Sequence, residues 1–142
     1  MGIDYLAIPI DRAKTKALDR GVKVEFLVAD ALELGAFPRQ FDSIIDCGLF
    51  HIFSDDDCVR YYVEGLAHFL RSGGKLFLLC FNDEEPGAQG PRRVTQQELR
   101  HAFAEGWQIK SIQASRFEVI PGMKDLFSEG GPKAWFTVVS RL

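Results

Sequence analysis

The chain has 142 residues, a formal net charge of −3 and a hydrophobic content of 46%. That length and apolar content predict one folded domain, residues 1–142, with a core of its own. The acidic balance leaves no basic surface for a phosphate backbone, so we expect no nucleic-acid partner. We expect no membrane partner either, because no segment approaches the roughly 20 apolar residues of a membrane helix and no signal peptide opens the chain.

The three cysteines favour a reduced environment. Cys47, Cys58 and Cys80 are odd in number and form no CxxC pair, which predicts a cytoplasmic protein without structural zinc. We expect Cys47 to be a small buried residue, since no neighbouring feature lowers its pKa. The acids Asp55–Asp57 have no histidine or cysteine at ligand spacing, so we expect a solvated helix start there and no metal.

Strand and helix patterns alternate along the first third, which predicts an α/β sheet. We expect strands at Gly2–Asp4, from Val24 to Ala29 and from Phe41 to Asp46. Between the first two strands, Pro9 to about Arg20 fits a helix, with proline in the first turn and Gly21 as its stop.

The middle of the chain predicts a helix followed by a buried strand. Ser54 is the expected cap of a helix whose apolar stripe runs from Val59 to Leu70. Arg71–Gly74 forms the expected turn after it. The nearly continuous apolar run from Lys75 to Phe81 is typical of a strand buried on both faces.

The last third predicts one helix and two strands. Thr95 and Glu98 form a capping box that opens a short helix to about Glu105. The segments from Trp107 to Val119 and from Lys133 to Arg141 read as strands. The long loop between these strands makes an antiparallel return plausible.

Three of the expected strands run directly into an aspartate: Asp4, Asp30 and Asp46. In one parallel sheet these carboxylates would share the carboxyl edge, where open α/β sheets bind ligands. One acid can accept from a ribose diol and another from an exocyclic amine. The pattern therefore predicts a nucleotide-type site.

In their order, these segments resemble a class I S-adenosylmethionine-dependent methyltransferase over nearly the whole chain. The matching segments are Gly2–Asp4 with Ile10–Ala13, Val28–Ala31, Phe41–Asp46 and Leu70–Leu76. Ser72 stands where the family usually has proline. Gly90–Val94, leading into Glu98 and Leu99, is similar to the branch with thiopurine and tellurite-resistance methyltransferases. The resemblance implies a Rossmann-like, open, mostly parallel sheet with an antiparallel C-terminal strand.

The resemblance also implies how S-adenosylmethionine would be held. Asp4 would accept from both ribose hydroxyls, although a solvated acid near the terminus is the alternative. Asp30 would accept from the adenine amino group, with the N–H of Ala31 on a ring nitrogen; a cap after the strand is the alternative. Asp46, Cys47 and Gly48 would lie near the methionine moiety, where glycine permits close approach.

A second group of residues would face the methyl acceptor. Phe50 and Phe53 would wall the adenine or acceptor side, and His51 would be a general base. The alternatives are two core phenylalanines and a surface histidine. Arg92 and Arg93 would hold an anionic acceptor or close the mouth of the site, unless they are exposed loop charges.

The resemblance begins only at the family's second strand. The Gly-rich cofactor loop and the first strand, which lies between the second and fourth, have no counterpart, so we expect an N-terminally incomplete domain. Either another surface fills the resulting slot or the strand of Val24–Val28 pairs with that of Ile44–Ile45. An open slot between strands is an aggregation hazard. We therefore expect a homo-oligomer that covers it.

These features predict methyl transfer to a small-molecule S, O or N acceptor. Phe50, Phe53, Phe81 and Trp107 favour an apolar or aromatic acceptor, although such residues are often core. One alternative is a non-catalytic remnant or regulatory partner that keeps the scaffold without binding the cofactor. Another is a dinucleotide-binding oxidoreductase, which shares only the layout of strand-end acids.

Overall fold

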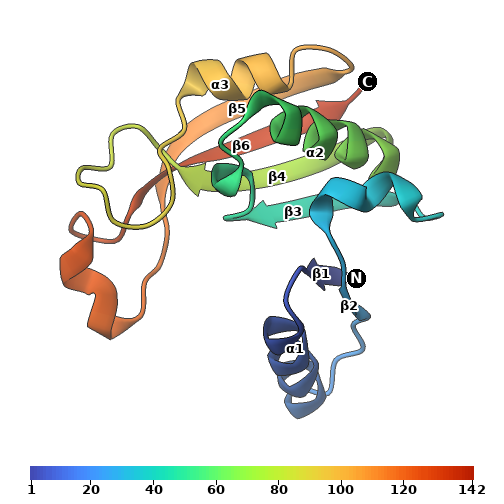
Figure 1. Cartoon of the computed structure of the whole chain (residues 1–142), viewed down its shortest axis with the longest axis horizontal. Helices are drawn as coiled ribbons and strands as arrows, with labels where there is room; N and C mark the ends of the chain where they lie inside the picture. Colours follow the sequence, from blue (N-terminus) through green and yellow to red (C-terminus); the bar gives the residue numbers. More distant parts are fainter.

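The computed structural model describes residues 1–142 apart from the side chain of Ala36, and it contains two β-sheets (Figure 1). The strands are β1 (Gly2–Asp4), β2 (Phe26–Val28), β3 (Phe41–Cys47), β4 (Leu70–Phe81), β5 (Trp107–Arg116) and β6 (Lys133–Arg141). The α-helices are α1 (Ala7–Asp19), α2 (Asp56–Phe69) and α3 (Gln96–Ala102). Three 3-10 turns are η1 (Ala31–Ala36), η2 (Phe50–Ile52) and η3 (Pro121–Leu126).

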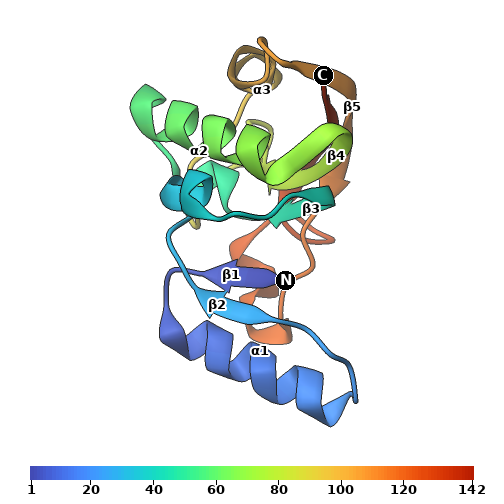
Figure 2. The same cartoon turned by 90° about the vertical axis from the view of Figure 1, so that its right-hand side faces the viewer.

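The larger sheet has the strand order β3-β4-β6-β5. β3 is parallel to β4, whereas β6 is antiparallel to both β4 and β5. α2 and α3 lie on one face of this sheet (Figure 1 and Figure 2). The chain thus has an α/β, Rossmann-like fold with a mixed sheet, and the predicted antiparallel C-terminal strand is confirmed.

The hydrophobic core lies between this sheet and its helices. β4 is exposed at Arg71–Gly73 and alternates buried and less buried residues from Gly74 to Cys80. One face of the strand is therefore more deeply buried than the other, and the expected burial on both faces is only partly met. Side chains from β4, α2 and α3 meet aromatic rings from the connecting segments. Among the most deeply buried are Phe50, Leu66, Leu70, Leu76, Leu78, Leu99 and Phe103.

The smaller sheet pairs β1 with β2 in parallel, and α1 connects the two strands. Figure 2 shows β1 lying between β2 and β3. α1 buries Ile10 and Ala17, while Ile8 and Leu18 on the same helix are exposed. Two short strands and one helix therefore provide little core of their own.

The three strands that end in aspartates do not form one sheet, so that part of the prediction is wrong. β2 pairs with β1 and not with β3, which also excludes the expected alternative of direct pairing. β1 and β3 nevertheless point the same way, so their carboxyl ends lie at the same side of the molecule (Figure 1).

Local predictions differ from the structure mainly at element ends. Asp55 caps α2, accepting from the N–H of Cys58 at 2.8 Å, where the sequence suggested Ser54. The expected turn at Arg71–Gly74 lies within β4, as a bulge: the ladder passes from Phe41–Leu70 directly to Ser43–Lys75. The bulge includes Gly73, with a φ of 79° that glycine adopts without strain.

Two further findings concern the whole described chain. No α-helix in the described residues is both long and apolar enough to cross a membrane. The three cysteines are free thiols.

The capping box of α3 gives a stability prediction. The hydroxyl of Thr95 accepts from the N–H of Glu98 at 3.1 Å, and the Glu98 carboxylate accepts from the N–H of Thr95 at 2.7 Å. Thr95→Ala should lower the free energy of unfolding by about 1 kcal/mol, because the N–H of Glu98 loses its acceptor. Thr95→Ser keeps the hydroxyl and should stay near wild type in urea unfolding. Equal losses in both variants would contradict this assignment.

Candidate functional site

Asp4 and Asp30 follow two neighbouring parallel strands. Oδ1 of Asp4 accepts from the N–H of Leu6, and Oδ1 of Asp30 accepts from the N–H of Leu32, both at 2.8 Å. Asp30 thereby caps η1, as the cap alternative predicted. Within the described chain, Oδ2 of each carboxylate has no hydrogen-bond partner. Each side chain is therefore fixed by its own turn while one oxygen remains for a ligand.

Both carboxylate oxygens of Asp46, at the end of β3, accept hydrogen bonds from the protein. Its buried carboxylate accepts from the N–H of Leu49 (2.8 Å), the N–H of Phe50 (3.1 Å) and the hydroxyl of Tyr62 (2.9 Å). Burial raises the pKa of Asp46, and these three hydrogen bonds partly oppose that effect. The structure thus shows Asp46 holding the turn of residues 47–50, and any cofactor contact here falls to the backbone.

Cys47 and Gly48 form the exposed part of this turn. Gly48 has a φ of 88°, and its N–H donates to the carbonyl of Leu79 at 2.9 Å. A Cβ at this position would lie 3.4 Å from Nε2 of His51. Cys47 is exposed, so the prediction of a buried residue is wrong; its side chain alternates with that of the buried Asp46. Partial burial and the Asp46 carboxylate raise the pKa of the Cys47 thiol, which disfavours a nucleophilic role.

His51 is buried in η2 next to Gly48. Its Nδ1 accepts from the backbone N–H of Phe81 at 3.0 Å, so the neutral ring carries its proton on Nε2. Burial, followed by the positive charge of Arg92, lowers the pKa of His51 to about 4. The ring is therefore a neutral hydrogen-bond donor at pH 7. The predicted general base would need the other tautomer.

An aromatic cluster surrounds the His51 ring. Phe81 and Phe117 lie with their ring centroids 5.2 Å and 5.8 Å from that of His51, and Phe127 lies 5.6 Å from Phe81. The loop after β5 contributes Phe117 and Phe127, and it also lines a hollow of about 680 Å³ beside Phe127. The sequence analysis missed these two phenylalanines, because no local pattern relates a loop residue to a strand end more than 30 residues away.

Phe50 and Phe53 lie in the core. Phe50 stacks on Phe103 with centroids 6.0 Å apart, and Phe53 contacts Tyr62 at 5.0 Å. The structure therefore favours the core alternative for both rings. An acceptor-facing role for them stays a prediction.

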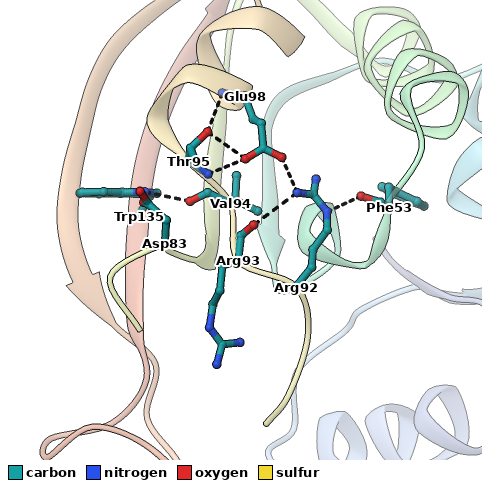
Figure 3. A network of polar contacts seen from close by, with 8 residues as sticks. All are labelled: Phe53, Asp83, Arg92, Arg93, Val94, Thr95, Glu98 and Trp135. Atoms are coloured by element: carbon teal, nitrogen blue, oxygen red, sulfur yellow. Dashed lines mark hydrogen bonds and ion pairs between the residues drawn. The ribbon is translucent and has the colours of Figure 1, made fainter. Parts of the chain in front are cut away.

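Arg92 joins its own loop to the segment after η2 and to the start of α3 (Figure 3). Its Nε donates to the carbonyl of Phe53 at 2.6 Å, and its Nη1 forms an ion pair with Glu98, also at 2.6 Å. Glu98 in turn belongs to the capping box of α3 with Thr95. Arg92 thereby ties the segment after η2 to the start of α3.

Arg93 organises the loop between β4 and α3. Its guanidinium donates to five backbone carbonyls, those of Glu85, Pro86, Gly87, Gln89 and Pro91. It also lies 5.2 Å from the centre of the Phe81 ring. Arg92 and Arg93 are half-buried, so the alternative of exposed loop charges is wrong. Contact of either residue with an acceptor stays a prediction.

Glu85 is a buried acid that the sequence analysis did not single out. Its carboxylate accepts from the N–H of Ser128 at 2.9 Å and the N–H of Lys133 at 2.8 Å. Burial raises the pKa of Glu85, but these hydrogen bonds and the charge of Arg93 outweigh it and leave the pKa below its usual value. Glu85 thus joins the loop before α3 to the loop that contributes Phe127.

The described residues include no group of three or more metal-binding side chains. The chemistry of the strand ends instead suits a polar organic ligand: two carboxylate oxygens, a glycine turn without a Cβ, and neighbouring aromatic rings. These groups come from β1, β2, β3 and the loops after β4 and β5.

Comparison with known proteins gives a family match. The family described as "Methyltransferase domain" matches residues 1–74, slightly more than half of the chain. A 2-heptyl-1-hydroxyquinolin-4(1H)-one methyltransferase of Mycobacteroides abscessus is 28% identical over 134 residues, covering 92% of this chain and 57% of that protein. The chain therefore spans little more than half the length of this relative.

Solved structures show the same fold. A protein studied for the conversion of a disulfide bond into a thioacetal group during echinomycin biosynthesis is 31% identical, with a TM-score of 0.82 over 99% of this chain and 65% of that chain. TehB from Haemophilus influenzae is 12% identical, with a TM-score of 0.68 over 98% of this chain and 48% of its own. At that identity, the likeness to TehB concerns the fold alone.

The buried His51 gives a pH prediction. Its pKa is lowered from 6.5 to about 4 in the folded chain. Between these two pH values, His51 is therefore protonated in the unfolded chain and mostly neutral in the folded chain. This difference should remove up to about 3 kcal/mol of unfolding free energy as the pH falls from 7 to 4.

Urea unfolding at both pH values should therefore show a smaller loss in His51→Gln than in the wild type. His101→Gln is the control, because this histidine is exposed on α3. An unchanged pH dependence in His51→Gln would contradict the lowered pKa.

Proposed function

The chain belongs to the methyltransferase domain family, and from that premise we propose that it transfers a methyl group from S-adenosylmethionine to an aromatic small molecule. The observation that carries the proposal is the common side at which β1, β2 and β3 end. Asp4, Asp30 and Gly48 lie at these ends, and the aromatic cluster of Phe81, Phe117 and Phe127 lies around His51 beside Gly48. Polar groups for a nucleoside thus adjoin an apolar region for an acceptor.

The polar groups fit S-adenosylmethionine. Oδ2 of Asp4 would accept from the ribose hydroxyls and Oδ2 of Asp30 from the adenine amino group. The N–H of Ala31, in the first turn of η1, needs no intrahelical acceptor and suits an adenine ring nitrogen. Gly48 lets the backbone approach the methionine part, because its missing Cβ leaves that space open. When bound, the cofactor supplies an electrophilic methyl group on a sulfonium.

The protein's own contribution to the reaction is mainly orientation. A methyl acceptor that is held in line needs no dedicated acid–base pair, since proximity supplies a large part of the rate. His51 would orient the acceptor through its Nε2–H. The rings of Phe81, Phe117 and Phe127 would exclude water and stack on a flat acceptor.

Two features support an aromatic acceptor. One is this aromatic cluster, and the other is the hydroxyquinolone named for the Mycobacteroides abscessus relative. The acceptor atom, S, O or N, is left to experiment. Membership in the thiopurine and tellurite-resistance branch is part of the proposal and is supported by Gly90–Val94 and Glu98. A cytoplasmic location is a further part, supported by the free thiols.

Cofactor binding can be measured by calorimetric titration with S-adenosylhomocysteine. We expect saturable binding that weakens roughly ten- to hundred-fold in Asp4→Ala and Asp30→Ala, because each removes a charged hydrogen-bond acceptor. Asp56→Ala, at the start of α2, is the matched control and should bind as the wild type does. A folded sample without binding would favour the non-catalytic alternative, a remnant or regulatory partner.

Acceptor choice can be tested with radiolabelled S-adenosylmethionine and a panel of phenols, thiols and inorganic chalcogen anions. We expect label in an aromatic compound, and Phe117→Ala or Phe127→Ala should raise its KM several-fold with a smaller change in kcat. Phe136→Ala is a control, because this ring pairs with Phe77 away from His51. Label in macromolecules alone would overturn the small-molecule assignment.

A further inference from the structure

We propose that Glu85 is a positioning residue for the acceptor: its buried carboxylate holds the loop of residues 117–132, between β5 and β6, so that Phe127 stays packed in the aromatic cluster. This role rests on the aromatic acceptor site of the proposed function. Glu85 itself lies in the loop of residues 82–95, between β4 and α3. Both loops extend beyond the same end of the larger sheet (Figure 1).

The carboxylate of Glu85 connects the two loops in a buried place. Glu85 is 3% exposed. Its Oε1 accepts from the N–H of Ser128 at 2.9 Å, and its Oε2 accepts from the N–H of Lys133 at 2.8 Å. A buried charge without hydrogen-bond donors is costly, so the carboxylate and these two amides depend on each other. One bond therefore holds the residue next to Phe127, and the other holds the first residue of β6.

The loop that carries Glu85 is itself well anchored. The backbone N–H of Glu85 donates to the carbonyl of Asn82, directly after β4, at 3.2 Å. Nε of Arg93 donates to the carbonyl of Glu85 at 3.0 Å, and the same guanidinium binds four further carbonyls of this loop. Glu85 thus reaches the neighbouring loop from a fixed position.

The loop between β5 and β6 has little burial of its own near Phe127. Every residue of η3 is exposed, and Phe127 and Ser128 are half-buried. The N–H of Phe117 donates to the carbonyl of Pro132 at 2.9 Å, which closes this loop at its base. Segments with few buried contacts open most readily. The bond from Ser128 to Glu85 is therefore what fixes the part of the loop that carries Phe127.

The position of Phe127 affects the region proposed for the acceptor. Its ring lies 5.6 Å from that of Phe81, at an angle of 84°. A Cβ on Gly90 would lie 3.1 Å from the Phe81 ring and 3.4 Å from the Phe127 ring, so glycine lets the backbone of residues 82–95 lie against both rings. When the loop of Phe127 opens, a flat ligand loses one of its stacking surfaces. Its apparent dissociation constant then rises as the fraction of closed chains falls.

Ligand affinity can be measured without turnover by fluorescence titration with 2-naphthol, a flat phenol. Glu85→Ala should bind it roughly ten-fold more weakly than the wild type, because the N–H of Ser128 loses its charged acceptor and the loop opens. Glu85→Gln should lie between the two, since its amide keeps one acceptor oxygen. Glu84→Ala, an exposed neighbour in the same loop, is the matched control and should bind as the wild type does. Equal affinity in the wild type and Glu85→Ala, or no binding to the wild type, would overturn the proposal.

Hydrogen exchange measures the opening of the loop directly. The N–H of Gly131 donates to the carbonyl of Ser128, and the N–H of Phe117 to that of Pro132, both at 2.9 Å. Neither bond involves Glu85, so these two amides should exchange at least ten-fold faster in Glu85→Ala only if the loop opens. The amide of Leu78, in the centre of the larger sheet, should exchange equally in both proteins. If Glu85→Ala does not fold, Glu85→Gln gives the same comparison with a smaller difference. Unchanged exchange of Gly131 and Phe117 would contradict the role of Glu85.

Failure of the proposed function gives a different result from failure of this role. If 2-naphthol binding depends on Glu85 but no label is transferred from radiolabelled S-adenosylmethionine, methyl transfer is wrong and the role of Glu85 stands. If label is transferred with the same acceptor KM in the wild type and Glu85→Ala, methyl transfer stands and the role of Glu85 is wrong. In an active enzyme we expect the acceptor KM to rise with a smaller change in kcat, a pattern that a general loss of folded protein does not produce.

Discussion

Backbone hydrogen bonding is the constraint on which this structure depends. Every strand of the larger sheet except β3 and β5 has a partner on both sides, and the core forms where that pairing is complete. β1 and β2 satisfy only each other. The chain therefore divides into a well-packed part, built on β4 and β6, and a part built on β1, β2 and α1 that has few buried side chains. Asp4 and Asp30, which we propose to bind the cofactor, belong to the second part, so its order decides how firmly they are held.

The three aspartates at the strand ends differ in how many hydrogen bonds they accept from the protein. Asp46 accepts three hydrogen bonds from the chain, so it fixes the turn that contains Gly48. Asp4 and Asp30 accept one bond each. The three strand-end acids looked equivalent in the sequence, but their hydrogen-bond partners give them different roles.

The sequence predicted the element order, the capping box of Thr95 and Glu98, and the antiparallel last strand, because these depend on local patterns. It also predicted a slot between the strands of Gly2–Asp4 and Phe41–Asp46, and these strands do lie in separate sheets. The alternative of direct pairing between the strands of Val24–Val28 and Ile44–Ile45 was wrong. Arg92 and Arg93 were expected near an acceptor, but their partners are backbone carbonyls and Glu98, which no spacing rule reveals. Phe117, Phe127 and Glu85 were missed because their contacts span 30 residues or more.

Side-chain hydrogen bonds join the loops around His51, on the side that we propose for the acceptor. Glu85 joins the two loops, Arg93 binds the carbonyls of one of them, and Arg92 ties η2 to α3 through Glu98. Side chains supported in this way keep a site near its productive geometry. Asp4 and Asp30, on the side that we propose for the cofactor, are instead held by their own turns. Any contact that orders β1 and β2 would therefore act on cofactor binding first and leave the aromatic cluster unchanged.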